Sequence, residues 1–258
     1  MMRHAGLALI PLPFQGEVRP GDDLVEKLRL ALRQQKLTLR EGDIVVIKHK
    51  IVSKAEGQLV ELSRVRPSRA ARAWANKCGG DPRLIELALA ESRRVVRKKM
   101  LDKRRGVLIT ETHHGLICAN SGVDLSNVDG GRRAALLPAD PDGSARRLRR
   151  AIKKNSGVSV GIVISDSFGR PWREGLTEVA IGVAGIAPLD DFRGKRDSHG
   201  YLLRASAEAV ADELACAAGL VCGKLKRTPV CIVRGYRAGA AQGTAQELLR
   251  RAQDDLFR

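Results

Sequence analysis

Six short runs rich in valine and isoleucine are spread along the chain, and they restrict the folds that it can form. Runs of this length and composition predict β-strands. They occupy residues 43–48, 107–111, 115–119, 158–165, 178–184 and 230–234. The N-terminal sequence GLALIPL, which contains Pro11, predicts one further strand at residues 6–12.

Helical periodicity appears between several of these strands. The predicted helices cover residues 23–36, 82–92, 144–155, 202–222 and 243–257. The sequence GDD at 21–23 supplies carboxylates at the start of the first helix. Asp81 and Pro82 supply an N-cap and a first-turn proline for the second helix, and either Asp142 or Ser144 would cap the third. Strands and helices mix without the strict alternation that predicts a parallel doubly wound sheet. The predicted fold class is therefore mixed α/β, of the α+β kind.

The composition is that of an ordinary globular protein. With 258 residues and 43% hydrophobic content, the chain can bury a sizeable core, either as one domain over residues 1–258 or as two subdomains that meet near residue 150. No run approaches the roughly 18 apolar residues of a membrane span. The five cysteines are scattered and never form a Cys-x-x-Cys pair. We therefore expect reduced thiols, no membrane partner and a cytoplasmic location.

The net charge of +17 indicates an anionic partner. Residues 93–105 carry eight basic side chains and one acidic, and residues 146–154 carry six basic and none acidic. In the second stretch Ala145, Leu148 and Ile152 recur at helical spacing, so its arginines could simply form the solvated face of an amphipathic helix. Binding to single-stranded nucleic acid generally needs stacking aromatics, which make up only 3% of the chain. A nucleic-acid partner is thus the less favoured alternative.

The sequence CANSGVDLSNV at 118–128 follows a predicted strand and is dense in oxygen-bearing side chains. Asp124 and the neighbouring Asn and Ser residues offer the carboxylate, amide and hydroxyl oxygens that hard cations prefer, and Gly122 permits a tight backbone. The alternative is a loop in which these side chains satisfy only their own backbone. The segment predicts a metal-binding loop centred on Asp124.

A second acidic motif, VSVGIVISDS at 158–167, ends a buried strand with Asp166 and Ser167. A carboxylate beside a hydroxyl at the carboxyl end of a strand is a common way to present Mg²⁺ to nucleotide phosphates. Arg170 and Arg173 follow and could act as phosphate forks. Together with Asp124, this motif predicts a divalent metal held against a phosphate-bearing substrate.

Three further segments have candidate roles. The sequence HKIVSKAEG at 49–57 places a lysine where it could neutralise a transferring phosphoryl group, or else forms a solvated basic turn. The helix that begins near Asp142 presents an N-terminus suited to anions, and the polar loop 189–203 is long enough to be functional. His113 and His114 lack a third ligand at readable spacing. No Gly-x-x-x-x-Gly-Lys-Ser/Thr sequence is present, so no P-loop is expected.

Six motifs, taken in order, resemble the coenzyme F420-0:L-glutamate ligase family. They are HKIVSKAEG, CANSGVDLSNV, LLPADPDGSA, ISDSFGRPWREG, DDFRGKRDSHG and PVCIVRG, and the resemblance runs from GDDL at 21–24 to about Gly235. It implies a GTP- and metal-dependent ligase that adds L-glutamate, through a γ-glutamyl linkage and an acyl phosphate, to the deazaflavin precursor coenzyme F420-0. It leaves open the addition of a second glutamate and the use of another anionic acceptor.

The resemblance also implies roles for particular residues. Asp124 and Asp166 resemble ligands of one metal, Ser167 resembles a ligand of a second, and Asp166 and Lys54 are the residues expected to take part in catalysis. Residues that match the family's nucleotide contacts are Gln15, Gly16, Glu17, Val18, His49, Lys50, Lys54 and Asn127. The chain departs from the family at Gly16, where a proline is usual, and at Lys224, where a relative can carry an acidic or amide ligand. A protonated lysine cannot bind a metal.

The ligands and assembly that the resemblance implies are equally specific. The metal would be Mg²⁺ or Mn²⁺, with K⁺ as a candidate additional ion, and the substrates would be GTP, L-glutamate and coenzyme F420-0. The fold would be an unusual α+β arrangement in an intertwined homodimer. Some relatives carry a C-terminal domain of the nitroreductase kind, which is not expected in these 258 residues.

Overall fold

The computed structural model describes residues 6–239 and 241–255, and a five-stranded mixed sheet forms its centre. The strands lie in the order β1 (Ala8–Leu12), β12 (Val230–Arg234), β2 (Ile44–Lys48), β8 (Gly161–Arg170) and β9 (Arg173–Ala184). Only β2 and β8 are parallel neighbours within this sheet. Each strand overlaps one of the valine- and isoleucine-rich runs or the N-terminal run, so the predicted strands are confirmed. β9 begins five residues earlier than expected, and β8 continues to Arg170, past Asp166 and Ser167, where its end was expected.

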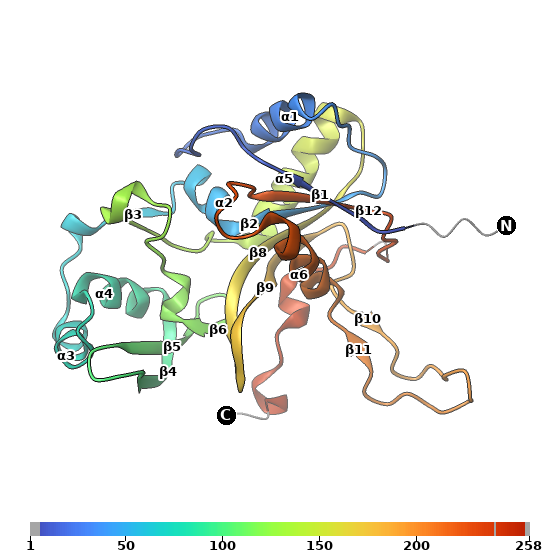
Figure 1. Ribbon diagram of the computed structural model, residues 1–258. Coiled ribbons are helices and arrows are strands. Elements are labelled where there is room, and N and C mark those ends of the chain that lie inside the picture. The colour runs from blue at the N-terminus through green and yellow to red at the C-terminus, as the bar shows by residue number, and fades with distance from the viewer. Residues whose placement is uncertain (1–5, 240, 256–258) are drawn as a thin grey trace.

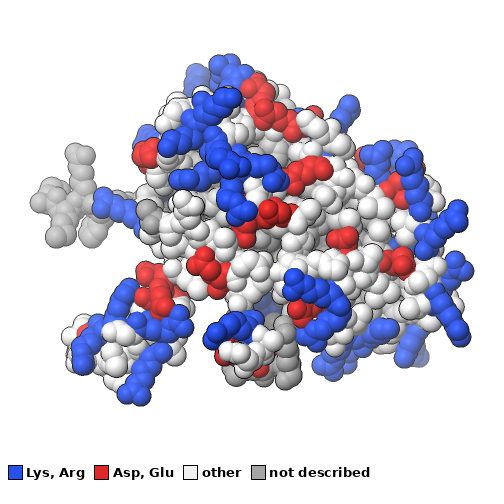
Figure 2. Space-filling model, turned by 180° about the vertical axis from the view of Figure 1, so that it is seen from behind, with Lys and Arg blue, Asp and Glu red and all other residues white. Residues whose placement is uncertain are grey.

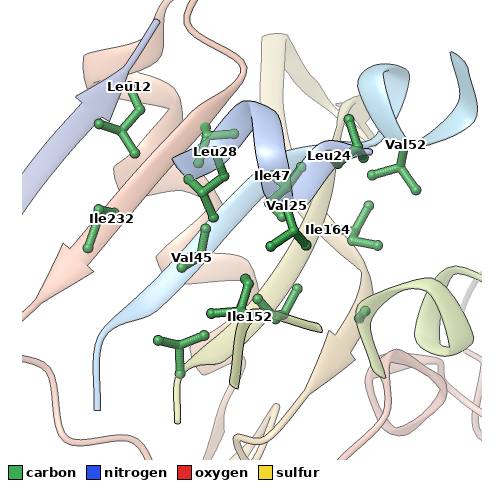
Figure 3. Packing of buried hydrophobic residues seen from close by; sticks show 14 of the residues in the cluster. Leu12, Leu24, Val25, Leu28, Val45, Ile47, Val52, Ile152, Ile164 and Ile232 are labelled. Carbon is green, nitrogen blue, oxygen red and sulfur yellow. The ribbon is translucent and has the colours of Figure 1, made fainter. Parts of the chain in front are cut away.

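Helices cover both faces of this sheet (Figure 1). On one face, α1 (Leu24–Gln34) and α5 (Pro141–Ser156) pack against Val45 and Ile47, a contact that Figure 3 shows from close by. On the other face, α6 (Val210–Cys222) packs against Ile44 and Val46. Successive strand residues point to opposite faces, and burying each aliphatic side chain stabilises the fold by about 1.5–3 kcal/mol. This double burial explains why the strands are apolar without interruption.

Residues 59–137 form a second lobe beside the sheet (Figure 1). Its elements are β3 (Leu59–Glu61), α3 (Arg69–Cys78), α4 (Pro82–Ala90), β4 (Ser92–Met100), β5 (Gly106–Thr112), β6 (Ile117–Ala119) and β7 (Arg133–Ala135). Strands β4, β5 and β6 make one small sheet, and β3 pairs with β7. The lobe has its own core around Trp74 and Leu108. Mixed and antiparallel sheets with packed helices confirm the α+β class.

The sequence analysis missed two helices. Ala71, Trp74, Ala75 and Cys78 are buried on one side of α3, a helical spacing that is present in the sequence. The other is α2 (His49–Ala55), which continues directly from β2 where a basic turn was the alternative. The basic stretch 93–105 lies mostly on β4, a strand that the sequence analysis did not predict.

Two predicted helices are wrong in extent or type. The helix expected over 202–222 begins only at Val210, because the preceding residues return along an extended arm in which β10 (Asp190–Asp191) pairs with β11 (Ala207–Glu208). The helix expected over 243–257 is replaced by two short 3₁₀ turns, Ala245–Leu248 and Ala252–Asp254, and residues 256 and 257 lie outside the described part. Tertiary hydrogen bonds hold this tail, including one from the Gln246 side chain to the His114 carbonyl.

The helix caps follow the predictions at two of three starts. Asp23 and Asp81 accept backbone hydrogen bonds at the starts of α1 and α4. At α5 the cap is Asp140, so the expectation of Asp142 or Ser144 is wrong. Asp142 is buried instead, and its Oδ1 accepts hydrogen bonds from the amides of Val183 (2.7 Å) and Ala245 (2.9 Å).

The remaining expectations concern boundaries and membranes. Residue 150, near which a subdomain boundary was expected, lies inside α5. Over the part of the chain that the structure describes, no helix combines the length and apolar character needed to cross a membrane.

Candidate active site

A cavity of about 890 Å³ opens at the carboxyl end of β2, beside residues 165–167 in the middle of β8. These strands are parallel neighbours in which Lys48 faces Ser165, so the segments that follow them emerge side by side. His49 and Lys50 continue from β2 into α2, and Asp166 and Ser167 continue along β8. The two motifs, separated by more than a hundred residues, thereby meet at one edge of the sheet, where ligands usually bind in sheets of this kind.

Asp166 is the most enclosed carboxylate of the metal motifs. Its Oδ1 lies 3.1 Å from His49 Nε2 and also accepts a hydrogen bond from the Ser167 amide at 2.7 Å. Burial opposes ionisation of this carboxyl, but His49, the Ser167 amide and the charge of Lys50 together outweigh it and hold the pKa below the ordinary value of 3.8. The His49 ring is itself buried and lies 3.3 Å from Ser53 Oγ through Nδ1. Asp166 is therefore an oriented anion at the cavity wall.

Asp124 reaches the same cavity from the second lobe. Lys50 Nζ donates to Asp124 Oδ2 at 2.5 Å and to the Ser126 carbonyl at 2.8 Å. Burial opposes ionisation, but hydrogen bonds from Lys50 and Ser126 hold the pKa of Asp124 below its ordinary value. Lys50 thus links the end of the central sheet to the CANSGVDLSNV loop, which supplies one wall of the cavity.

Lys54 lies one helical turn beyond Lys50 on α2. Its Nζ pairs with Glu17 Oε2 at 2.9 Å, and the Lys54 side chain is 10% exposed whereas that of Glu17 is 62% exposed. This pair brings the N-terminal loop over the cavity. A buried ammonium whose partner is so exposed can exchange that partner for an anionic ligand.

The structure brings together ten of the eleven residues predicted for the site. The residues that line the cavity are Gly16, Glu17, Val18, His49, Lys50, Lys54, Asp124, Asn127, Asp166 and Ser167. Gln15 is the exception, since it is not part of the lining. Lys224, the residue that departs from the family, also lines the cavity.

Three functional groups at the cavity were missed by the sequence analysis. Lys48, Ser165 and Glu178 line it, and they contact one another through the Glu178 carboxylate. Lys48 and Ser165 are the first polar residues after the apolar runs of β2 and β8, which could have indicated them. Nothing in the sequence places Glu178 opposite Ser167, because that register depends on how β9 pairs with β8.

Other candidate segments lie away from the cavity. No residue of 93–105, 146–154 or 189–203 lines it, and the structure describes all three segments. Arg170 donates to the Glu174 carbonyl within the β8–β9 hairpin, and neither Arg170 nor Arg173 reaches the cavity. Lysine and arginine side chains instead spread over much of the surface with acidic side chains between them (Figure 2).

The oxygen donors at the cavity suit a hard divalent cation. Asp124 and Asp166 offer carboxylates with lowered pKa values, and Ser167 donates its proton to Glu178, which leaves the hydroxyl lone pairs available. Among the described residues, no group of three His, Cys, Asp or Glu side chains is arranged to hold a metal. Asp124, Asp166 and Ser167 could therefore hold a cation such as Mg²⁺ only if a bound substrate or water supplied its other ligands.

The cavity combines the carboxylates of Asp124 and Asp166 with the ammonium groups of Lys50 and Lys54, an arrangement typical of enzyme sites that bind anionic substrates. The family profile described as F420-0:Gamma-glutamyl ligase matches residues 15–235. The chain belongs to this family, so the resemblance drawn from its motifs is confirmed.

Three curated relatives are similar over most of their length. The coenzyme F420:L-glutamate ligase of Methanothermobacter thermautotrophicus is 42% identical over 256 residues, which is 98% of this chain and 99% of the relative. The protein of the same name from Methanopyrus kandleri is 42% identical over 98% of each chain. That from Methanocaldococcus jannaschii is 39% identical over 90% of this chain and 91% of the relative.

Proposed function

We propose that this chain is a ligase that joins L-glutamate to coenzyme F420-0 by a γ-glutamyl linkage and hydrolyses GTP to GDP and phosphate. The observation that carries the proposal is the convergence of Asp124, Asp166, Lys50 and Lys54 on one cavity in a member of this family. The relatives are named for glutamate ligation to coenzyme F420. The use of GTP and the acyl-phosphate intermediate are proposed because the chain has motifs that match the family's nucleotide contacts.

In the proposed reaction a carboxylate oxygen of the acceptor attacks the γ-phosphorus of GTP, and the bond to GDP breaks. The amine of glutamate then attacks the acyl carbon, the bond to phosphate breaks, and an amide forms. Phosphoryl transfer of this kind depends mainly on positioning and on neutralising charge. The site therefore has to hold two anionic substrates close together.

The chain's own cations provide much of that neutralisation. Lys54 lies buried beside the N-terminal loop and exchanges Glu17 for a phosphate oxygen, while His49 keeps Asp166 oriented and ionised. When a divalent metal is bound by Asp124 and Asp166, with Ser167 beside them, it would neutralise charge on the phosphates. Lys224 supplies a further positive charge at the same cavity and favours one metal over two.

The proposal is tested by incubating the protein with GTP, Mn²⁺ or Mg²⁺, L-glutamate and coenzyme F420-0. Mass spectrometry should show products heavier by one glutamate residue, and by two if a second addition follows, with GDP released only when all components are present. Asp166→Asn should abolish turnover with a preserved melting temperature. Asp102→Asn, in an exposed turn of the second lobe, is the matched control and should retain full activity. Absence of any glutamate adduct with the wild type would rule out the proposal.

We also propose that the enzyme is a homodimer. The arm that contains β10 and β11 extends away from the central sheet (Figure 1), and Tyr201 and Leu202 are exposed on it. An extended arm with exposed apolar side chains suits contact with a second chain. Light scattering after size exclusion should give twice the chain mass of 28.0 kDa, and a single chain mass at micromolar concentration would contradict the dimer.

The second candidate function, nucleic-acid binding, is favoured by the basic stretches outside the cavity. It predicts binding to any DNA or RNA with a steep dependence on salt. Absence of binding at physiological salt, together with a rise in melting temperature on adding GTP, would exclude it.

A further inference from the structure

The cavity wall that faces α6 carries three polar side chains, besides Ser167, with no part in the reaction as described above. Along β8 the side chains alternate, so Asp166 shares the face of Ile164, whereas Ser165 and Ser167 share the opposite face with Val163. Lys48 lies on that opposite face as well, because it follows Ile47 by one position. We call Lys48, Ser165, Ser167 and Glu178 the α6 wall.

Glu178 is the centre of the α6 wall. Its Oε1 accepts a hydrogen bond from Ser167 Oγ at 2.7 Å and pairs with Lys48 Nζ, and its Oε2 accepts from Ser165 Oγ at 3.0 Å. The Glu178 side chain is only 12% exposed. Three donors therefore satisfy the carboxylate oxygens, and among these three only Lys48 carries a charge.

The packing of α6 holds Glu178 in place. A Cβ at position 219 would lie 2.7 Å from Glu178 Cγ, so only glycine lets the helix approach this closely. The Cys216 thiol, one turn earlier, donates to the Glu178 carbonyl at 3.0 Å. The carboxylate is therefore fixed relative to Ser167, whose neighbour Asp166 belongs to the opposite side of the site.

A fixed carboxylate that faces a lysine ammonium in a cavity is complementary to an amino acid. A ligand ammonium can take the place of Lys48 at Glu178, and Lys48 can then pair with a ligand carboxylate. Lys224 and Arg227 line the same cavity and offer cations for a second carboxylate. An α-amino acid with an acidic side chain satisfies all of these groups.

We propose that the α6 wall is the binding site of the amino-acid substrate, with Glu178 contacting its ammonium group. This inference rests on the proposed ligase function. The side of β8 that carries Asp166 faces the predicted nucleotide contact His49, and the amino acid occupies the other side, so GTP and the amino acid approach the acceptor carboxylate from opposite sides. Ser167, which donates to Glu178 and adjoins Asp166, lies at the boundary between them.

Glu178 would hold the substrate amine beside the acyl carbon in the second half of the reaction. The carbon–nitrogen bond forms and the carbon–oxygen bond to phosphate breaks. Of the two protons that the substrate ammonium loses, one leaves with the phosphate and the other passes to water, which balances the step.

The experiment separates the two halves of the reaction. Hydroxylamine intercepts an acyl phosphate as a hydroxamate and needs no amino-acid site, so hydroxamate formation reports the first half alone. Glu178→Gln should form hydroxamate within about twofold of the wild type, while its KM for L-glutamate rises by about 10- to 100-fold through loss of a charge-assisted contact. Lys48→Met should also raise this KM, and Glu61→Gln, outside the cavity on β3, should leave it unchanged.

Two results would overturn the inference. One is a glutamate KM within twofold of the wild type in Glu178→Gln, and the other is loss of hydroxamate formation in parallel with ligation. Should the glutamine variant unfold, Glu178→Asp, which keeps the charge, serves as a second test. Its KM for L-glutamate should lie between that of the wild type and that expected for Glu178→Gln. A wild type that forms neither hydroxamate nor product would refute the proposed function instead, so the two failures are distinguishable.

Discussion

The buried carboxylate of Asp142 provides the sharpest test of how this fold is held together. Asp142→Ala removes the acceptor of two buried amide groups, those of Val183 on β9 and Ala245 in the C-terminal tail. Each buried amide left without a partner costs about 1–3 kcal/mol, so the free energy of unfolding should fall by about 2–6 kcal/mol. Asp142→Asn keeps an oxygen acceptor and should cost only about 1 kcal/mol.

The matched variant is Asp140→Ala, which removes the observed cap of α5. Loss of a cap costs about 0.5–2 kcal/mol. Urea denaturation at pH 7, followed by circular dichroism with fitted m-values, measures all three variants. If Asp142 were the helix cap, the order of the two alanine variants would be reversed. A loss in Asp142→Ala no larger than that in Asp140→Ala would refute the role assigned to this residue.

Three further predictions concern charge. Lys54→Met should lower kcat by about 10²–10³-fold with a preserved fold, because a buried cation beside the transferring phosphate is lost. Steady-state GDP release measures kcat, and an unchanged value would contradict this prediction. Arg234→Met leaves Asp43, which is 2% exposed, without its cation and should cost about 3–5 kcal/mol in urea denaturation, whereas Arg193→Met, in an exposed pair, should cost less than about 1 kcal/mol. Burial, opposed by a backbone hydrogen bond, raises the pKa of Asp212 above 3.8, so its ionisation destabilises the fold as the pH rises through the raised value. Asp212→Asn should therefore be more stable than the wild type at pH 7, with the difference lost below pH 3.8; equal stability of the two proteins at pH 7 would argue against it.

Much of the central sheet is predictable because its strands contain continuous apolar runs that can be recognised in the sequence. The runs that became β2, β8 and β12 are buried on both faces, and only continuous apolar residues tolerate such burial. The N-caps at Asp23 and Asp81 are equally local, since a cap depends on residues within one turn. Local chemistry decides these features, so a single sequence suffices to find them.

The errors fall where tertiary contacts override local preference. The tail after residue 243 has helical periodicity, yet hydrogen bonds to Asp142 and His114 hold it in short 3₁₀ turns. Residues 202–209 continue the apolar pattern of α6, but pairing with the opposite side of the arm keeps them extended. In both cases a distant partner offered the backbone better hydrogen bonds than an isolated helical turn could.

For the site, the sequence alone was enough to select Asp124, Asp166, Lys50 and Lys54 as candidates, because they stand in short motifs with recognisable chemistry, and all four line one cavity. Only the tertiary structure decided how they combine. The parallel pairing of β2 with β8 brings the two motifs to one edge, and the pairing of β9 with β8 adds Glu178 from a strand without any motif. Strand register is a property of two segments together, so neither segment by itself could reveal the second face of the cavity.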